Sequence, residues 1–146
     1  IYVRYKKAGS GTLGTVSSTL ETNNTKITNF PVNTNTYYVI SDKAATQRVS
    51  YTVGYMKEFP GFNIYVGGGM GNNQVYWNAQ TYSYASPGLL VSDTWVKNKV
   101  QSANGLEGEV GGTVKFKNFN LQGGVSFIKG ISSLYISADF GVGITF

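Results

Sequence analysis

The sequence predicts an all-β fold, an antiparallel up-and-down barrel, on the strength of its residue alternation, its composition and its pattern of connections. In the last thirteen residues, "LYISADFGVGITF", every even-numbered position from Leu134 to Phe146 is apolar, and the odd ones are small or polar apart from Tyr135. A period of two indicates a strand with one apolar and one polar face. Charged residues make up only 13% of the 146 residues and aromatic residues 14%, a balance that favours pleated sheets.

Six segments show this alternation, and no segment shows a convincing helical period. In chain order they are residues 1–6, 48–59, 62–71, 106–117, 118–128 and 134–146. We therefore expect at least six strands, each with an apolar and a polar face.

The connections between these strands alternate in length. "FPGF" (59–62) and "KNFN" (117–120) are tight turns built from Pro, Gly or Asn. The stretches 8–46 and 81–104 are long and polar, and we expect loops there, the first with short extra strands such as "TYYVI". Tight turns at one end and long loops at the other are typical of an up-and-down barrel, here a single domain over residues 1–146.

Aromatic residues near the strand ends indicate which solvent the apolar face meets. They form two predicted belts that flank strands of about ten residues, the length that crosses a bilayer. Belts of this kind are typical of the two water–lipid interfaces of a membrane barrel. The predicted girdle consists of Phe59, Phe62, Phe116 and Phe119 at the tight turns and of Trp77 and Trp95 toward the long loops.

The polar face predicts a lumen filled by charged side chains. Six strands would make an implausibly narrow barrel, so we expect eight, with a first hairpin that precedes Ile1 and a truncated N-terminus. The interior of an eight-stranded barrel is just wide enough for side chains to fill, and buried charges need partners. The predicted lumen network consists of Arg4, Lys6, Arg48, Glu107, Glu109, Lys115 and Asp139.

Several kinds of chemistry are disfavoured by the residues themselves. Cys and His are absent, so thiolate sites and the common general base are missing, and we expect no enzyme, metal or cofactor. The formal net charge is +5, but the 12 Lys and Arg are scattered, so no nucleic-acid partner is expected. Glu107 and Glu109 share a face, as in glycosidases or cation sites, but pairing with the inward cations is the preferred interpretation. "GGGMG" is followed by no helix that would make a phosphate loop.

The end of the chain carries a recognisable pattern. "DFGVGITF" resembles the assembly signal of bacterial outer-membrane barrels, with Asp139, Gly141, Ile144 and Phe146 in its polar, glycine, hydrophobic and aromatic places. "VGYMKEFPGFNIYVGGGMG" and "GLEGEVGGTVKFKNFNLQGGVS" add to the resemblance, so that residues 48–146 are similar to small outer-membrane β-barrel domains of Bacteroidota. The resemblance implies a bacterial outer-membrane location, and the lipid bilayer and the barrel assembly machinery as partners.

We therefore expect a non-enzymatic barrel that serves as a membrane anchor or as an accessory subunit of a larger envelope complex. Two alternatives stay open. One is a small pore or a surface ligand-binding barrel. The other, of a different class, is a secreted soluble β-sandwich adhesin whose apolar face is its core.

Overall fold

The structure, a computed structural model, describes residues 1–23, 26–30, 35–130 and 133–144. These residues confirm the all-β prediction, and no helix suited to crossing a membrane occurs among them. The strands of the described residues are β1 (Tyr2–Ser10), β2 (Val16–Thr22), β3 (Ile27–Thr28), β4 (Thr36–Phe59), β5 (Phe62–Ser83), β6 (Leu90–Asn98), β7 (Ala103–Phe116), β8 (Phe119–Lys129) and β9 (Leu134–Ile144).

The chain divides into two compact units. Unit 1 contains Ile1–Lys7, Arg48–Asn73 and Ala103–Phe146, and unit 2 contains Ala8–Gln47 and Gln74–Ser102. The long strands β4 and β5 contribute residues to both units. The expected single domain over residues 1–146 stays a prediction, because compactness alone does not show which part folds independently.

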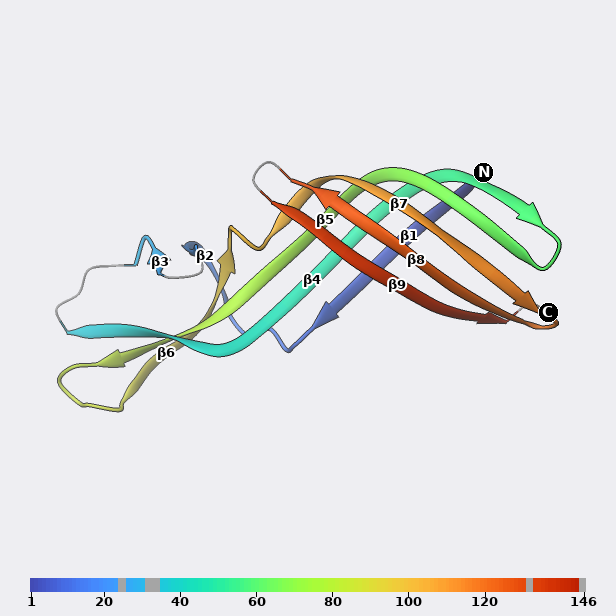
Figure 1. The fold of residues 1–146 in the computed structure, drawn as a ribbon. Coiled ribbons are helices and arrows are strands. Elements are labelled where there is room, and N and C mark those ends of the chain that lie inside the picture. The colour runs from blue at the N-terminus through green and yellow to red at the C-terminus, as the bar shows by residue number, and fades with distance from the viewer. Residues whose placement is uncertain (24–25, 31–34, 131–132, 145–146) are drawn as a thin grey trace. The chain divides into compact units, whose positions relative to one another are not determined.

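In unit 1, strands that are neighbours in the chain are also neighbours in the sheet. The order is β1-β4-β5-β7-β8-β9, and the pairs β5–β7, β7–β8 and β8–β9 are antiparallel (Figure 1). All six predicted strands are present. The two tight turns lie side by side, since Lys115 N–H donates to Gly61 O at 2.9 Å. Gly61 takes a positive φ of 84°, which a residue without Cβ adopts at no steric cost.

The sheet of unit 1 curls but does not close into a barrel among the described strands, so the predicted eight-stranded barrel, whose first hairpin is expected before Ile1, stays a prediction. Among the described strands, β1 pairs with β4 and β9 pairs with β8, which leaves β1 and β9 as two free edges. The curl still brings the edge strands within side-chain reach, because Lys6 Nζ of β1 lies 2.9 Å from Asp139 Oδ2 of β9. Six strands bring side chains together across the inner face, while the backbones of β1 and β9 do not pair.

Burial in unit 1 runs opposite to that of an ordinary soluble domain. Charged and polar side chains are buried on the inner face, with Glu107 and Glu109 each only 3% exposed. Large apolar side chains cover the outer face, where Ile136 is 62% and Phe140 86% exposed. Strands β4, β7 and β9 each alternate in this sense, as the sequence pattern predicts.

Unit 2 has conventional apolar cores instead. One joins Ile27, Ala79 and Val96, with partly buried apolar neighbours such as Ile40. Its strand order is β3-β2-β6-β5, and β2 runs parallel to β6. The sheet is therefore mixed, and the prediction of a wholly antiparallel arrangement is wrong at this pair.

The two stretches expected as loops, 8–46 and 81–104, are largely strands. The first holds β2, β3 and the start of β4, and the second holds β6. The Thr- and Asn-rich sequence shows little alternation because these strands bury only scattered apolar residues. Such residues form a core only when strands distant in the chain come together.

Candidate functional site

The site with the richest chemistry is a polar cluster on the inner face of unit 1. It joins three cations to three carboxylates, so its formal charge is zero. We call it the charge network, and its members are Arg4, Lys6, Arg48, Glu107, Glu109 and Asp139.

Lys6 is the centre of this network. Its Nζ lies 2.6 Å from Glu109 Oε2, 3.0 Å from Glu107 Oε1 and 2.9 Å from Asp139 Oδ2. The Lys6 side chain is 13% exposed and the two glutamates are almost wholly buried. One ammonium thus connects β1 to both β7 and β9 through charge-assisted hydrogen bonds, which are stronger than neutral ones.

The two arginines complete the neutralisation of the glutamates. Arg4 Nη1 lies 3.1 Å from Glu109 Oε2, and Arg48 Nη2 lies 2.7 Å from Glu107 Oε1. Arg48 also lies 3.5 Å from Asp139 Oδ1. Each carboxylate therefore has at least two cations within 4.0 Å, which offsets much of the cost of burying it.

Hydroxyl groups donate further hydrogen bonds to Glu109 and Asp139, whereas Glu107 Oε2 is buried without a hydrogen-bond partner among the described residues. Tyr2 Oη donates to Glu109 Oε1 at 2.9 Å, and Thr52 donates to the same oxygen. Ser126 Oγ donates to Asp139 Oδ2 at 2.9 Å and accepts from Arg48 Nη2 at 2.7 Å. These hydroxyls hold Glu109 and Asp139 in place, and the sequence prediction did not single them out.

Lys115, the seventh residue predicted for the network, lies elsewhere. Its nearest carboxylate is Glu58 at 3.9 Å, and the two side chains are 46% and 73% exposed. Lys115 follows the inward parity of Glu107 and Glu109, but it stands at the turn end of β7, where the strand has passed beyond the buried cluster. Whether a position is odd or even decides which face of the strand its side chain occupies, whereas its position along the strand decides whether the side chain is buried.

Tyr65 is the largest buried side chain on the inner face, and its position depends on glycines. Its phenol oxygen occupies the space that a Cβ would take at Gly111 and Gly124. Arg4 Cζ lies 4.2 Å from the centre of the Tyr65 ring, a cation–π distance. The glycine pairs in the β7 and β8 sequences are the signal that could have predicted this contact. They leave room for a ring on neighbouring backbone.

The four phenylalanines of the predicted girdle gather at the turn end of unit 1, and their place at a water–lipid interface stays a prediction. At the turn end, the Phe59 and Phe62 rings stack with their centroids 4.8 Å apart, and Phe116 faces Phe119 across the β7–β8 pair. Phe62, Phe116 and Phe119 are between 43% and 56% exposed. Four phenylalanines therefore lie together at the ends of the four strands that the tight turns connect.

Trp95 departs from the girdle prediction, and Trp77 occupies a mixed environment. Trp95 is only 7% exposed and packs with Ala45 and Tyr76 in the second core of unit 2. Trp77 is half-buried and donates from its indole nitrogen to Gln101 Oε1 at 3.2 Å. The assignment of Trp95 to an exposed belt is wrong, because an apolar cluster formed by distant strands covers it.

The predicted terminal signal is described as far as Ile144. Asp139 points to the inner face and belongs to the charge network, whereas Ile144 is 59% exposed. Gly141 faces Gln122 across the β8–β9 pair. Phe146 lies outside the described residues.

The charge network connects four strands of unit 1 through ion pairs. Among the described residues, no three His, Cys, Asp or Glu side chains are grouped so as to hold a metal ion. Each carboxylate of the charge network has two cations within 4.0 Å. Comparison with protein-family models, with curated proteins and with solved structures gives no match.

Proposed function

We propose that this protein is a non-enzymatic β-barrel of the bacterial outer membrane that acts as an anchor or an accessory subunit of a larger envelope complex. The observation that carries the proposal is the inverted burial of unit 1, with charges inside and large apolar side chains outside. A soluble domain of this size would expose the charges and bury Val66, Val110 and Ile136, which are each between 57% and 62% exposed. A bilayer supplies the apolar surroundings that such a face needs.

Closure of the barrel follows from the same argument. Backbone groups that face hydrocarbon must be hydrogen-bonded, so the free edges of β1 and β9 require partners in a membrane. Two further strands between β1 and β9 would give eight, the usual minimum for bacterial barrels. Direct pairing of β1 with β9 in an experimental structure would contradict this eight-stranded arrangement.

The neutral charge network favours an anchor over a pore. Its three cations and three carboxylates contact one another across the inner face and link β1, β4, β7 and β9. A lumen filled in this way leaves little room for a solute to pass. We expect no conductance when the purified full chain is added to planar bilayers, and open-channel current would instead support the pore alternative.

The proposal is tested by asking whether the native fold depends on an apolar phase. The full chain should fold in detergent micelles or phospholipid vesicles, with a β-rich circular dichroism spectrum and an electrophoretic mobility that changes on boiling. In aqueous buffer alone it should aggregate. A monodisperse, folded protein without detergent would refute the barrel and support the soluble adhesin.

A ligand-binding role is the second candidate, favoured by a pocket in unit 2. The pocket has a volume of about 620 Å³, and its lining includes Thr12, Asp42, Asn78, Asp93 and Trp95. Asn78 is buried, donates to Asp93 and accepts from Ser41 Oγ at 2.9 Å, so the polar wall is held in place. Screening of glycans against the full chain, with Asp93→Ala as the comparison, tests this role, and equal binding by both proteins would contradict it.

A further inference from the structure

A groove crosses the outer face of unit 1, and its shape comes from the strand register. Ile64, Gly112, Gly123 and Phe140 lie in one cross-strand row, so two residues without side chains separate two large apolar ones. A Cβ added at Gly123 would meet no atom within 4 Å, so the space over this residue is open.

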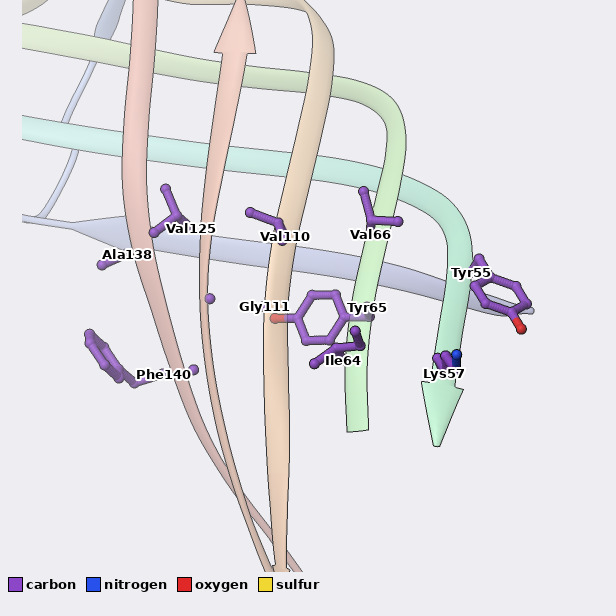
Figure 2. Close-up of a pocket in the computed structure, with 12 residues that line it drawn as sticks. Tyr55, Lys57, Ile64, Tyr65, Val66, Val110, Gly111, Val125, Ala138 and Phe140 are labelled. Atoms are coloured by element: carbon purple, nitrogen blue, oxygen red, sulfur yellow. The ribbon is translucent and has the colours of Figure 1, made fainter. Parts of the chain in front are cut away.

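The neighbouring row forms a wall of the groove. It consists of Val66, Val110, Val125 and Ala138, which face one another across β5, β7, β8 and β9 (Figure 2). The groove has a volume of about 760 Å³ and is lined almost wholly by apolar atoms. From β4 to β9 it crosses four strand spacings, which is about 19 Å. That shape suits a flexible hydrocarbon chain.

A single cation lies at the β4 end of the groove. Lys57 lines it together with Tyr55, and its Nζ lies 5.2 Å from the centre of the Phe59 ring (Figure 2). Within the described part of the chain, no carboxylate lies within 4.0 Å of Lys57, whereas the nearby Lys115 has Glu58 at 3.9 Å. Lys57 is therefore a cation available to an anionic group from outside.

The charged residues near the two tight turns of unit 1 also have a net positive charge, like Lys57. The sequence near the two tight turns contains three lysines, Lys57, Lys115 and Lys117, and one carboxylate, Glu58, which leaves a formal excess of two positive charges. The four phenylalanines at the same turns are the girdle expected at a water–lipid interface. An anionic headgroup at this depth would meet Lys57 while its acyl chain enters the groove.

We propose that this groove binds an anionic glycerophospholipid, with its phosphate on Lys57 and one acyl chain over Gly123. The inference rests on the proposed membrane location, and it names the class of lipid that the outer face of the barrel would bind. A purely apolar groove would take any acyl chain, and the unpaired lysine supplies the preference for an anionic headgroup. One lysine near an anionic headgroup corresponds to about a fivefold preference.

The headgroup is tested by native mass spectrometry of the full chain in detergent. The probes are phosphatidylglycerol and phosphatidylcholine with identical acyl chains. We expect about five times more retained phosphatidylglycerol than phosphatidylcholine. Lys57→Gln should bring the two lipids to parity, whereas Lys117→Gln, which removes the same charge at the same end, should keep the preference. Equal retention of both lipids by the unmodified chain would overturn the proposal.

The proposed position of the acyl chain is tested with variants that fill the groove. Gly123→Leu places a side chain in the open space and should abolish lipid retention, with Val125→Phe as a second filling variant. Gly68→Leu is the matched control, because Gly68 is an exposed glycine outside the groove lining. If a correctly folded variant with a filled groove retains as much lipid as the unmodified chain, the proposed position of the acyl chain is wrong. Retention of glycerol 1-phosphate to the same extent as phosphatidylglycerol would show a soluble-phosphate site and overturn the lipid assignment.

These outcomes separate the groove from the barrel. If the unmodified chain folds into vesicles but does not prefer phosphatidylglycerol, the groove proposal fails and the barrel proposal stands. If the chain folds in buffer without detergent, both proposals fail.

Discussion

Lys6 is the cation whose removal tests the charge network most directly. Lys6→Met keeps most of the aliphatic volume and removes the ammonium that touches Glu107, Glu109 and Asp139. The network then holds three carboxylates and two guanidinium groups, so one negative charge on the inner face loses its partner.

The expected loss of stability follows from burial. Glu107 and Glu109 side chains are at most 1% exposed, and Lys6 itself is 13% exposed. Removing one member of a buried ion pair costs about 3–5 kcal/mol, because the remaining charge stays desolvated. Adding Asp139→Asn restores neutrality, and we expect it to recover about 1–3 kcal/mol of the loss through the coupling of neighbouring sites.

Urea unfolding of the chain in micelles, followed by far-ultraviolet circular dichroism, measures this loss. Tryptophan fluorescence does not serve here, because Trp77 and Trp95 both belong to unit 2 and report on that unit. Lys115→Met is the control, and its exposed pair with Glu58 should contribute less than about 1 kcal/mol. If Lys6→Met costs no more than Lys115→Met, the charge network does not hold unit 1 together.

Three further predictions concern packing, and the same unfolding assay checks the first two. Gly111→Val should destabilise unit 1 by about 1–3 kcal/mol, because its Cβ would meet both the Tyr65 phenol and the backbone oxygen of Gly123. Gly123→Val enters open space and should change stability by less than about 0.5 kcal/mol. Tyr65→Ala should remove the part of this cost that comes from the ring, and an undiminished cost in the double variant would show that the ring contributes nothing to it. Trp95→Ala should lower the unfolding free energy of unit 2 by about 3–5 kcal/mol, and Trp77→Ala should lower it clearly less. Fluorescence from the remaining tryptophan in each variant measures the loss, and equal losses would contradict the core position of Trp95.

The strands of unit 1 could be predicted from the sequence because alternation is a local property. Residues two apart point to the same face of a strand, so the pattern from Leu134 to Phe140 identifies both the strand and its apolar side. The same logic placed Arg4, Lys6 and Glu107 on the polar side, where they meet.

Position along and between strands could not be predicted in this way. Lys115 has the parity of the charge network but stands beyond its end, and Trp95 has the composition of a belt residue but packs in a core. The first outcome depends on where the buried cluster ends along β7, and the second on which strands become neighbours. Local periodicity contains no information about either. The expected strand "TYYVI" is the start of β4, but β2 and β6 were missed, since their parallel pairing joins segments far apart in the chain.

By itself, the sequence of this protein determined the all-β class, the six alternating strands and the division between a charged and an apolar face. These features follow from the two-residue period of the backbone, which each segment carries on its own. The tertiary structure decided the contacts of Lys6 with three carboxylates, the seat of Tyr65 on two glycines, the free edges of β1 and β9, and the groove over Gly123. Each of these depends on the register between strands and on the curl of the sheet, which arise only when distant segments pair.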